Sequence, residues 1–133
     1  MKDGLLEITG YRDPGYRALI YHGGWRVALL NDDPARFRPE TLGYLERHNL
    51  TDEVFVLLSG ECTLLIGDGD TAGSHGSITP VRMESGMLYN VKRGVWHNLL
   101  GSPGMTLLIV ENADTSRDNS DYSDVSVDEI PLV

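Results

Sequence analysis

The shortness of its apolar runs is the feature of this sequence that most restricts its fold. The longest runs are residues 54–58 and 105–110, the second of which includes Thr106; both are far below the roughly 20 residues of a membrane-spanning helix. Glycine-containing turns such as Tyr21-His22-Gly23-Gly24 separate the runs. Many short strands with turns between them are typical of an all-β sandwich or barrel. The predicted strands are residues 16–21, 25–30, 42–48, 53–58, 62–66, 87–91, 95–99 and 105–110.

The segment 34–49 has two interpretations. Arg38-Pro39-Glu40-Thr41 resembles a helix start with proline near its first position. Leu42-Gly43-Tyr44 interrupts that helical pattern, and we therefore favour a strand at residues 44–48.

The glycine-rich segment 67–77 contains Asp68 and Asp70, but it does not match a calcium-binding loop. Ala72 occupies the place of a third oxygen ligand and Thr79 that of the closing glutamate. We expect a flexible surface loop here. We also expect His22 and His75 to be exposed, because both lie in glycine-flanked turns.

Length, charge and cysteine content restrict the class of protein and its partners. The 133 residues fit a single domain, 1–133. Twenty acidic against eleven basic side chains give a net charge of −9, which disfavours binding to a nucleic acid backbone. Much of that charge lies in the tail 113–133, which we expect to be a solvated surface. The single cysteine, Cys62, rules out an internal disulfide; together with the lack of an apolar leader, it leads us to expect a cytoplasmic protein without membrane contact.

Polar residues fall on the faces of the predicted strands that should point inward. Side chains alternate with period two, so Glu46 and His48 share a face, and Tyr44 lies on it as well. By the same rule Glu53 aligns with apolar neighbours on the next strand, and His97 lies between Val95 and Leu99. Because burial of unpaired polar groups is costly, these side chains should meet one another, a metal or a ligand.

Two imidazoles and one or two carboxylates in a cavity form a common binding site for a divalent first-row metal. The candidate ligands are Glu46, His48, Glu53 and His97, and the residue types admit zinc, iron, manganese or nickel. The alternative for the histidines is a hydrogen-bonded place in the core or at its rim. The alternative for Glu46 is a surface salt bridge to Arg47 or Arg93.

The spacing of these residues resembles the two motifs of the cupin superfamily. The first motif corresponds to His48, four residues, Glu53, six residues and Gly60; the second corresponds to Gly94-Val95-Trp96-His97-Asn98. Glu46 replaces the first histidine of the first motif, and Lys92 replaces the proline of the second. The resemblance implies a double-stranded β-helix, the cupin jelly-roll barrel, with a core at about 42–112, short N-terminal strands added to the sheet and, in many members, a metal.

A narrower likeness runs through Leu45-Glu46-Arg47-His48, the Phe55 strand, Lys92-Arg93-Gly94-Val95-Trp96-His97, Val110-Glu111-Asn112 and Asp118-Asn119-Ser120-Asp121. On these segments, residues 42–122 resemble ureidoglycolate lyase, a cupin-fold enzyme that releases urea from ureidoglycolate and leaves glyoxylate. This likeness implies a carbon–nitrogen lyase in which His97 or Glu53 acts as the catalytic base. Lys92 or Arg93 would bind the substrate carboxylate, for which an arginine fork is well shaped; the alternative for both is a solvated turn. Tyr44 and Trp96 are further candidates for substrate binding, and the alternative for them is a role in packing alone.

Two other functions remain open at this point. One is a cupin that binds a small ligand without catalysis, and the other is a metal-dependent cupin isomerase or dioxygenase. In each case the partner is a small molecule, and we expect a homodimer because the edges of β-sheets need covering.

Overall fold

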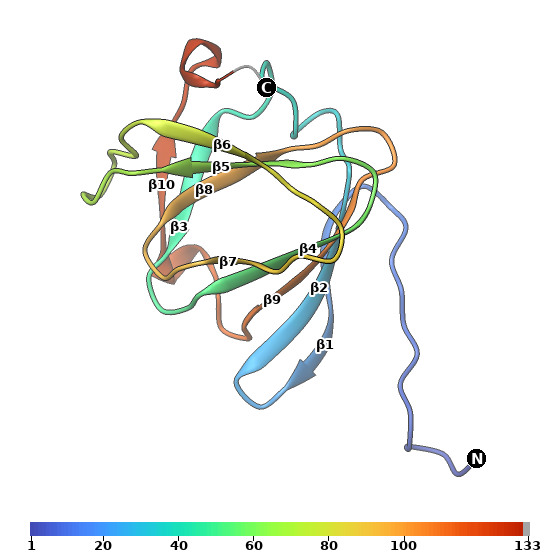
Figure 1. Ribbon diagram of the computed structural model, residues 1–133. Helices are drawn as coiled ribbons and strands as arrows, with labels where there is room; N and C mark the ends of the chain where they lie inside the picture. The colour runs from blue at the N-terminus through green and yellow to red at the C-terminus, as the bar shows by residue number, and fades with distance from the viewer. Residues whose placement is uncertain (132–133) are drawn as a thin grey trace.

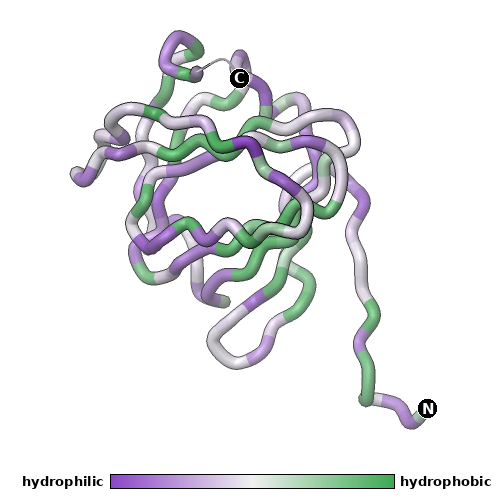
Figure 2. Tube along the Cα trace, in the orientation of Figure 1, coloured by the Kyte–Doolittle hydropathy of each residue, from purple (hydrophilic) through white to green (hydrophobic). Residues whose placement is uncertain are grey.

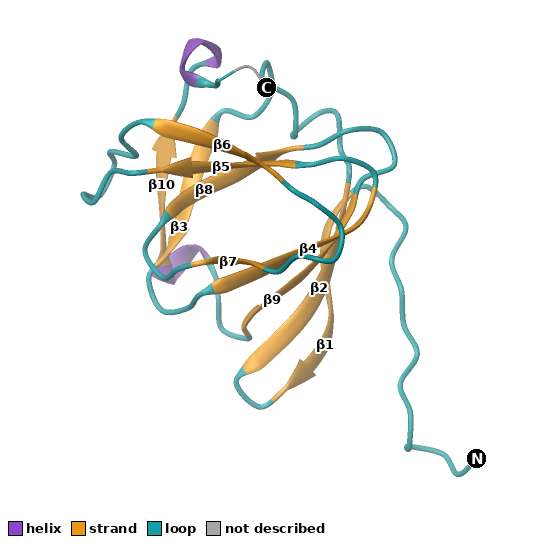
Figure 3. Cartoon of the chain, in the orientation of Figure 1, coloured by secondary structure: helices purple, strands orange, loops and turns teal. Residues whose placement is uncertain are grey.

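The computed structural model describes residues 1–131, and Leu132 and Val133 lie outside the described residues. Two antiparallel five-stranded sheets face each other (Figures 1 and 3), in the orders β1-β2-β9-β4-β7 and β10-β3-β8-β5-β6. Within residues 1–131 no helix is long and apolar enough to cross a membrane. The strands are β1 (Gly15–His22), β2 (Trp25–Asn31), β3 (Tyr44–His48), β4 (Glu53–Ser59), β5 (Thr63–Gly67), β6 (Ile78–Arg82), β7 (Tyr89–Val91), β8 (Trp96–Leu100), β9 (Thr106–Asn112) and β10 (Ser120–Asp124), and the single-turn 3₁₀ helices are η1 (Arg117–Asn119) and η2 (Val127–Glu129).

The core lies between the two sheets, and the alternation of the strands builds it. In β4 and β9 every second side chain is buried, so Phe55, Leu57, Leu107 and Ile109 meet in the space between the sheets. Hydrophobic segments follow the strands, whereas the loop between β5 and β6 is hydrophilic (Figure 2). The all-β prediction is confirmed, and β1 and β2 form the added N-terminal strands at one edge.

The segment 34–49 contains the favoured strand and not a regular helix. Turns with the backbone bonds Phe37 N–H to Asp33 and Leu42 N–H to Arg38 precede β3. Two strands were missed. β6 includes Pro80, which an edge strand tolerates, and β10 reads Ser-Asp-Tyr-Ser-Asp without an apolar alternation.

The prediction for His75 was wrong, and that for the acidic tail holds only for most of its acidic side chains: Asp114, Asp118, Asp124, Asp128 and Glu129 are exposed. β10 pairs with β3 along its full length, and Ser123, Val125 and Ile130 are buried. His75 is also buried; its Nδ1 lies 2.8 Å from Ser123 Oγ and its Nε2 3.1 Å from Glu129 Oε1. The loop 68–77 and the C-terminal segment thus cover the outer face of the β10–β6 sheet. His22 is exposed, as predicted.

The turn between β4 and β5 requires a glycine. Gly60 has φ +70°, and a Cβ atom there would lie 2.6 Å from the Met105 backbone nitrogen and Cα. Both the backbone conformation and the close approach of the neighbouring loop exclude a side chain. This turn sets where β4 ends and β5 begins.

Candidate functional site

A cavity of about 410 Å³ lies between the sheets and opens beside β3 and β10. β2, β4 and β9 supply one wall, and β3, β8 and β10 supply the other. Its side chains are mixed: aromatic and aliphatic groups surround a set of acidic, basic and imidazole groups. The aromatic and aliphatic lining includes Tyr16, Phe37, Tyr44, Phe55, Ile109 and Tyr122.

The structure brings together all four predicted metal ligands in this cavity. Glu46 lies directly opposite His97 in the pairing of β3 with β8. One oxygen of Glu53, Oε1, lies 3.1 Å from His48 Nε2 and 2.8 Å from His97 Nε2. Glu46 Oε1 is farther away, at 3.6 Å from His48 Nε2 and 4.0 Å from His97 Nε2. One ligand atom from each residue lies within 4.8 Å of the others.

Hydrogen-bond partners on the two Nδ1 atoms fix the orientation of the imidazole rings. His97 donates its Nδ1–H to the carbonyl oxygen of Val95 at 2.9 Å, and His48 Nδ1 lies 2.8 Å from Ser120 Oγ. Both Nε2 atoms therefore point at Glu53. Partners of this kind on the second ring nitrogen are typical of metal-binding histidines, because they fix the ring and its tautomer.

Electrostatics couple Glu53 to both histidines. Burial alone lowers the pKa of His97, but the hydrogen bond and charge of Glu53 outweigh it and raise this pKa to about 9. The same balance raises the pKa of His48 above its ordinary value. Burial alone raises the pKa of Glu53, but the hydrogen bonds from both imidazoles hold it well below its usual range. In the absence of a metal, the hydrogen bonds between Glu53 and the two imidazoles hold the cluster together.

This donor set fits a divalent first-row metal. Two imidazole nitrogens and two carboxylates, converging from three strands, are the mixed ligands that zinc, iron, manganese and nickel accept. His48, Glu53 and His97 are buried, and Glu46 is only partly exposed. Such a concentration of ionisable groups inside a protein is costly unless the groups are paired or bind a cation.

A second polar group borders the cluster, and its members lie on β1, β2 and β9. Tyr16 donates its hydroxyl to Glu111 Oε1 at 2.8 Å, and the Arg26 guanidinium pairs with the same oxygen at 3.0 Å. Burial, followed by the charge of Glu53, raises the pKa of Glu111 to about 7. The other oxygen, Glu111 Oε2, is buried without a hydrogen-bond partner. The alternation of β9, in which Glu111 follows Leu107 and Ile109 on the inward face, is the signal that sequence reasoning missed.

The structure places Tyr44 in the cavity but not Trp96. Tyr44 lines the wall made by β3. Trp96 precedes His97 on β8, so its side chain points to the opposite face of the sheet, where it is fully buried beneath the Arg47 guanidinium, 4.8 Å from its ring centroid. Trp96 therefore does not line this cavity, and its expected role in substrate binding finds no support here.

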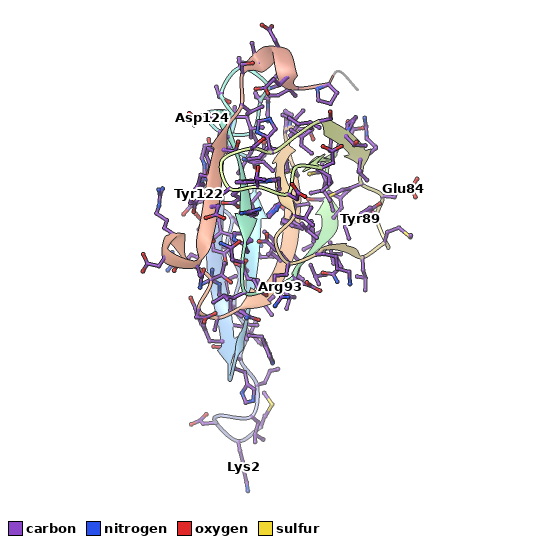
Figure 4. The ribbon with its side chains drawn as sticks, turned by 90° about the vertical axis from the view of Figure 1, so that its left-hand side faces the viewer. Lys2, Glu84, Tyr89, Arg93, Tyr122 and Asp124 are labelled. Atoms are coloured by element: carbon purple, nitrogen blue, oxygen red, sulfur yellow. The ribbon has the colours of Figure 1, made fainter. Side chains whose placement is uncertain are left out.

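Lys92 and Arg93 do not reach the cavity either. They lie exposed in the turn between β7 and β8, where Figure 4 shows Arg93 well below Tyr122. Lys92 Nζ lies 3.8 Å from Asp52 Oδ2, and the Arg93 backbone N–H donates to Asp52 Oδ1 at 2.8 Å. Neither residue lines the cavity, so their expected role as carboxylate-binding residues stays a prediction that this geometry does not support. The basic residues that line the cavity are Arg26, Arg36 and Arg117, none of which belongs to the second motif.

Comparison with known proteins identifies the architecture. A cupin-2 domain protein from Shewanella frigidimarina is 17% identical and superposes with a TM-score of 0.55 over 77% of this chain and 84% of its own. The chain has the cupin fold. The chain is also similar to the capsular polysaccharide assembling protein CapF of Staphylococcus aureus, with 16% identity and a TM-score of 0.62 over 89% of this chain and 32% of that one. The Bacillus subtilis oxalate decarboxylase, which contains Mn(II) centres, is 15% identical and matches with a TM-score of 0.51 over 74% of this chain and 24% of its own.

Sequence comparison gives a narrower likeness. No family model matches this chain. Ureidoglycolate lyase 2 of Rhizobium meliloti is 32% identical over 74 residues, which are 56% of this chain and 45% of the relative. The matched region thus spans less than half of the relative's length.

Proposed function

We propose that this cupin is a metal-dependent enzyme that acts on a small carboxylate-bearing metabolite, with ureidoglycolate as the first candidate substrate. The observation that carries the proposal is the cluster of Glu46, His48, Glu53 and His97 within one cavity. The likeness to ureidoglycolate lyase 2 supports the substrate class. The Mn(II) centres of oxalate decarboxylase support a metal in this fold.

The cavity suits a small metabolite. Its volume of about 410 Å³ lies at the lower end of the range of small-molecule sites, about 300–1,000 Å³. The wall mixes apolar surface with a few polar groups that converge on one region, as such sites require. A macromolecular substrate does not fit inside it.

His48, His97 and Glu53 would hold the metal, with Glu46 as the fourth ligand. When bound, a divalent ion supplies Lewis acidity, which polarises an oxygen of the substrate. Val95 and Ser120 hold the two imidazole rings in place. The chain therefore presents a site whose ligands are already oriented.

Release of urea from ureidoglycolate needs two proton transfers. A base takes the proton of the substrate hydroxyl, the O–H electrons form the carbonyl of glyoxylate, the carbon–nitrogen bond breaks, and the leaving nitrogen gains a proton. With His97 and Glu53 in the ligand set, we assign these transfers to Glu111, which lines the cavity and whose pKa is raised to about 7. Tyr16 and Arg26 hold its Oε1 atom and so fix the carboxyl group.

The test combines elemental analysis with an assay of glyoxylate release. We expect stoichiometric zinc, iron, manganese or nickel in the purified protein and release of glyoxylate from ureidoglycolate. His97→Ala should lose both the metal and the activity, and His22→Ala, which removes an exposed histidine, should lose neither.

Two outcomes contradict the proposal in different ways. Activity that survives in His97→Ala, or protein that binds none of the four metals after reconstitution, overturns the assigned site. Stoichiometric metal without glyoxylate release overturns ureidoglycolate as the substrate while the metal site stands.

A further inference from the structure

The cavity is lined by an arginine whose guanidinium forms no ion pair within the described residues. Arg117, in η1 between β9 and β10, lines the cavity and is exposed. No carboxylate within residues 1–131 forms an ion pair with it. Arg26 differs, because its guanidinium is bound by Glu111 and by the carbonyl oxygens of Ala113 and Thr115.

Arg117 lies at the end of the cavity that contains the cluster. β10 begins three residues later at Ser120, which is paired with His48 in the register of β10 and β3. The Arg117 guanidinium lies 5.5 Å from the centre of the Tyr122 ring, and Tyr122 is in turn paired with Glu46. Arg117 therefore stands over the strand pair that supplies two of the four candidate ligands.

The stacking on Tyr122 orients Arg117 for binding. A guanidinium that stacks on an aromatic ring keeps its N–H groups free at its edge, where they can bind a carboxylate in a two-pronged manner. Burial, followed by the charge of Glu46, raises the pKa of Tyr122, whereas the charge of Arg117 lowers it. The ring thus lies between an acidic ligand of the cluster and an unpaired cation.

The charged groups that line the cavity indicate why Arg117 matters for an anionic substrate. Glu46, Glu53 and Glu111 all line the cavity, and the chain as a whole carries −9. Arg26 is paired with Glu111, and both imidazoles face Glu53. Among the basic groups of the lining, Arg36 and Arg117 are therefore the ones left to attract an anionic substrate. The sequence analysis names Lys92 and Arg93 as candidates for binding a carboxylate, but neither residue lines the cavity.

We infer that Arg117 binds the carboxylate of the substrate while the reacting end of the molecule reaches the cluster. The inference rests on the proposed function in one respect, that the cluster is the reacting end. Beyond the proposed function, the inference gives the orientation of the bound substrate and names the residue that makes the site selective for a carboxylate. Arg117 is thus a specificity-determining residue contributed by a loop outside both cupin motifs.

Arg36 provides a matched control within the same cavity. It is exposed, and its guanidinium stacks 5.2 Å from the centre of the Phe37 ring. Its Nη1 atom, however, lies 3.8 Å from the position of a Cβ atom on Gly15, at the start of β1. The two arginines therefore reach the cavity from different elements, and only Arg117 contacts the β10–β3 strand pair.

The experiment measures binding of malonate and of its uncharged diamide, malonamide, by calorimetry. Both ligands are titrated into the protein as purified and after addition of zinc. Arg117→Gln should weaken malonate binding about ten-fold or more, since a charge-assisted pair is lost. Arg117→Lys should recover part of the loss, because the charge stays while the planar fork is gone. Arg36→Gln should change the affinity less than three-fold, and malonamide should not bind.

Three results overturn the inference: wild-type protein that binds no malonate in either state, Arg117→Gln that binds it as wild type does, or equal weakening by Arg117→Gln and Arg36→Gln. Zinc binding, measured separately, tests the cluster. Arg117-dependent malonate binding without zinc binding contradicts the proposed metal role alone. Zinc binding with malonate affinity independent of Arg117 contradicts this inference alone.

Discussion

Among single residues, Glu53 has the largest effect on the site, because one of its oxygens contacts both imidazoles. His48 Nε2 and His97 Nε2 lie 3.1 and 2.8 Å from Glu53 Oε1. Each imidazole is buried, and burial alone favours its neutral form. The negative charge of Glu53 reverses that preference. The protonation of the metal-free site is therefore set by one carboxylate.

Glu53→Gln should return His97 to the neutral form in metal-free protein. With the charge removed, burial dominates, and the pKa of His97 should fall from about 9 to below its ordinary value of about 6.5. Titration of the imidazole nitrogens by NMR measures it. His97 should be protonated at pH 7.5 in wild type and neutral in the variant. An unchanged titration would show that Glu53 does not control this proton.

Ser120→Ala should weaken metal binding without unfolding the protein. It removes the 2.8 Å contact to His48 Nδ1 and leaves the ring free to turn. Loss of such a supporting partner typically costs about 10–100-fold in metal affinity. Competition with a chelator measures the effect, and Ser77→Ala, at an exposed position on the β5–β6 loop, is the control. Equal affinity in the two variants would contradict a role for Ser120.

At the level of elements, the site depends on β3 and β8 being neighbours, since only then does Glu46 lie opposite His97. β5 pairs with β8 on the other side and so determines the position of β8. The turn that leads from β4 into β5 contains Gly60, the glycine of the first motif. A local backbone requirement in this turn is therefore transmitted to the cluster through two strand pairings.

Gly60→Ala should destabilise the fold more than Gly104→Ala. Both glycines have a positive φ, of +70° and +81°, but only at Gly60 would a Cβ atom meet backbone, at 2.6 Å from Met105. Gly104→Ala should cost about 1–2 kcal/mol for the left-handed backbone alone, and Gly60→Ala should cost clearly more. Urea unfolding measures the free energies. Equal losses would mean that the chain relaxes around the added methyl group.

In the whole molecule, the cluster links the two sheets, since Glu53 belongs to the sheet of β9 and the other three candidate ligands to the sheet of β10. A bound metal should therefore stabilise the entire fold. At a free metal concentration about 100 times Kd, the gain is about 2.7 kcal/mol. Thermal unfolding should show a Tm several degrees lower after EDTA treatment than with metal restored. An unchanged Tm would contradict a metal shared between the sheets.

The homodimer expected from the sequence stays a prediction. Within the described chain, Leu5, Leu6 and Ile8 on the N-terminal arm are 66%, 61% and 86% exposed, and the arm extends away from the sheets (Figure 1). Contact with a second copy would remove this apolar surface from water. Light scattering should give a mass about twice 14.7 kDa. A monomer mass at all accessible concentrations would contradict the prediction.

The strands and the inward direction of the site residues could be read from the chain because alternation is a local property. His48, Glu53 and His97 each take the face of their apolar neighbours, and all three enter the cavity. The same alternation places Trp96 on the outer face, because it is the strand neighbour of His97, which points inward. β10 could not be read in this way, because an edge strand of mostly polar residues shows no apolar alternation.

The sequence by itself determined the all-β class, the turns that need glycine and the set of inward polar groups, because these depend on neighbours along the chain. Only the tertiary structure decided which loops border the cavity. Ser120 supports His48 from 72 residues away, Arg117 approaches through the same strand pairing, and Lys92 and Arg93 turn away although they are close to His97 in sequence. Pairing between strands that are far apart in the sequence brings these residues together or keeps them apart, and a local sequence pattern does not contain that information.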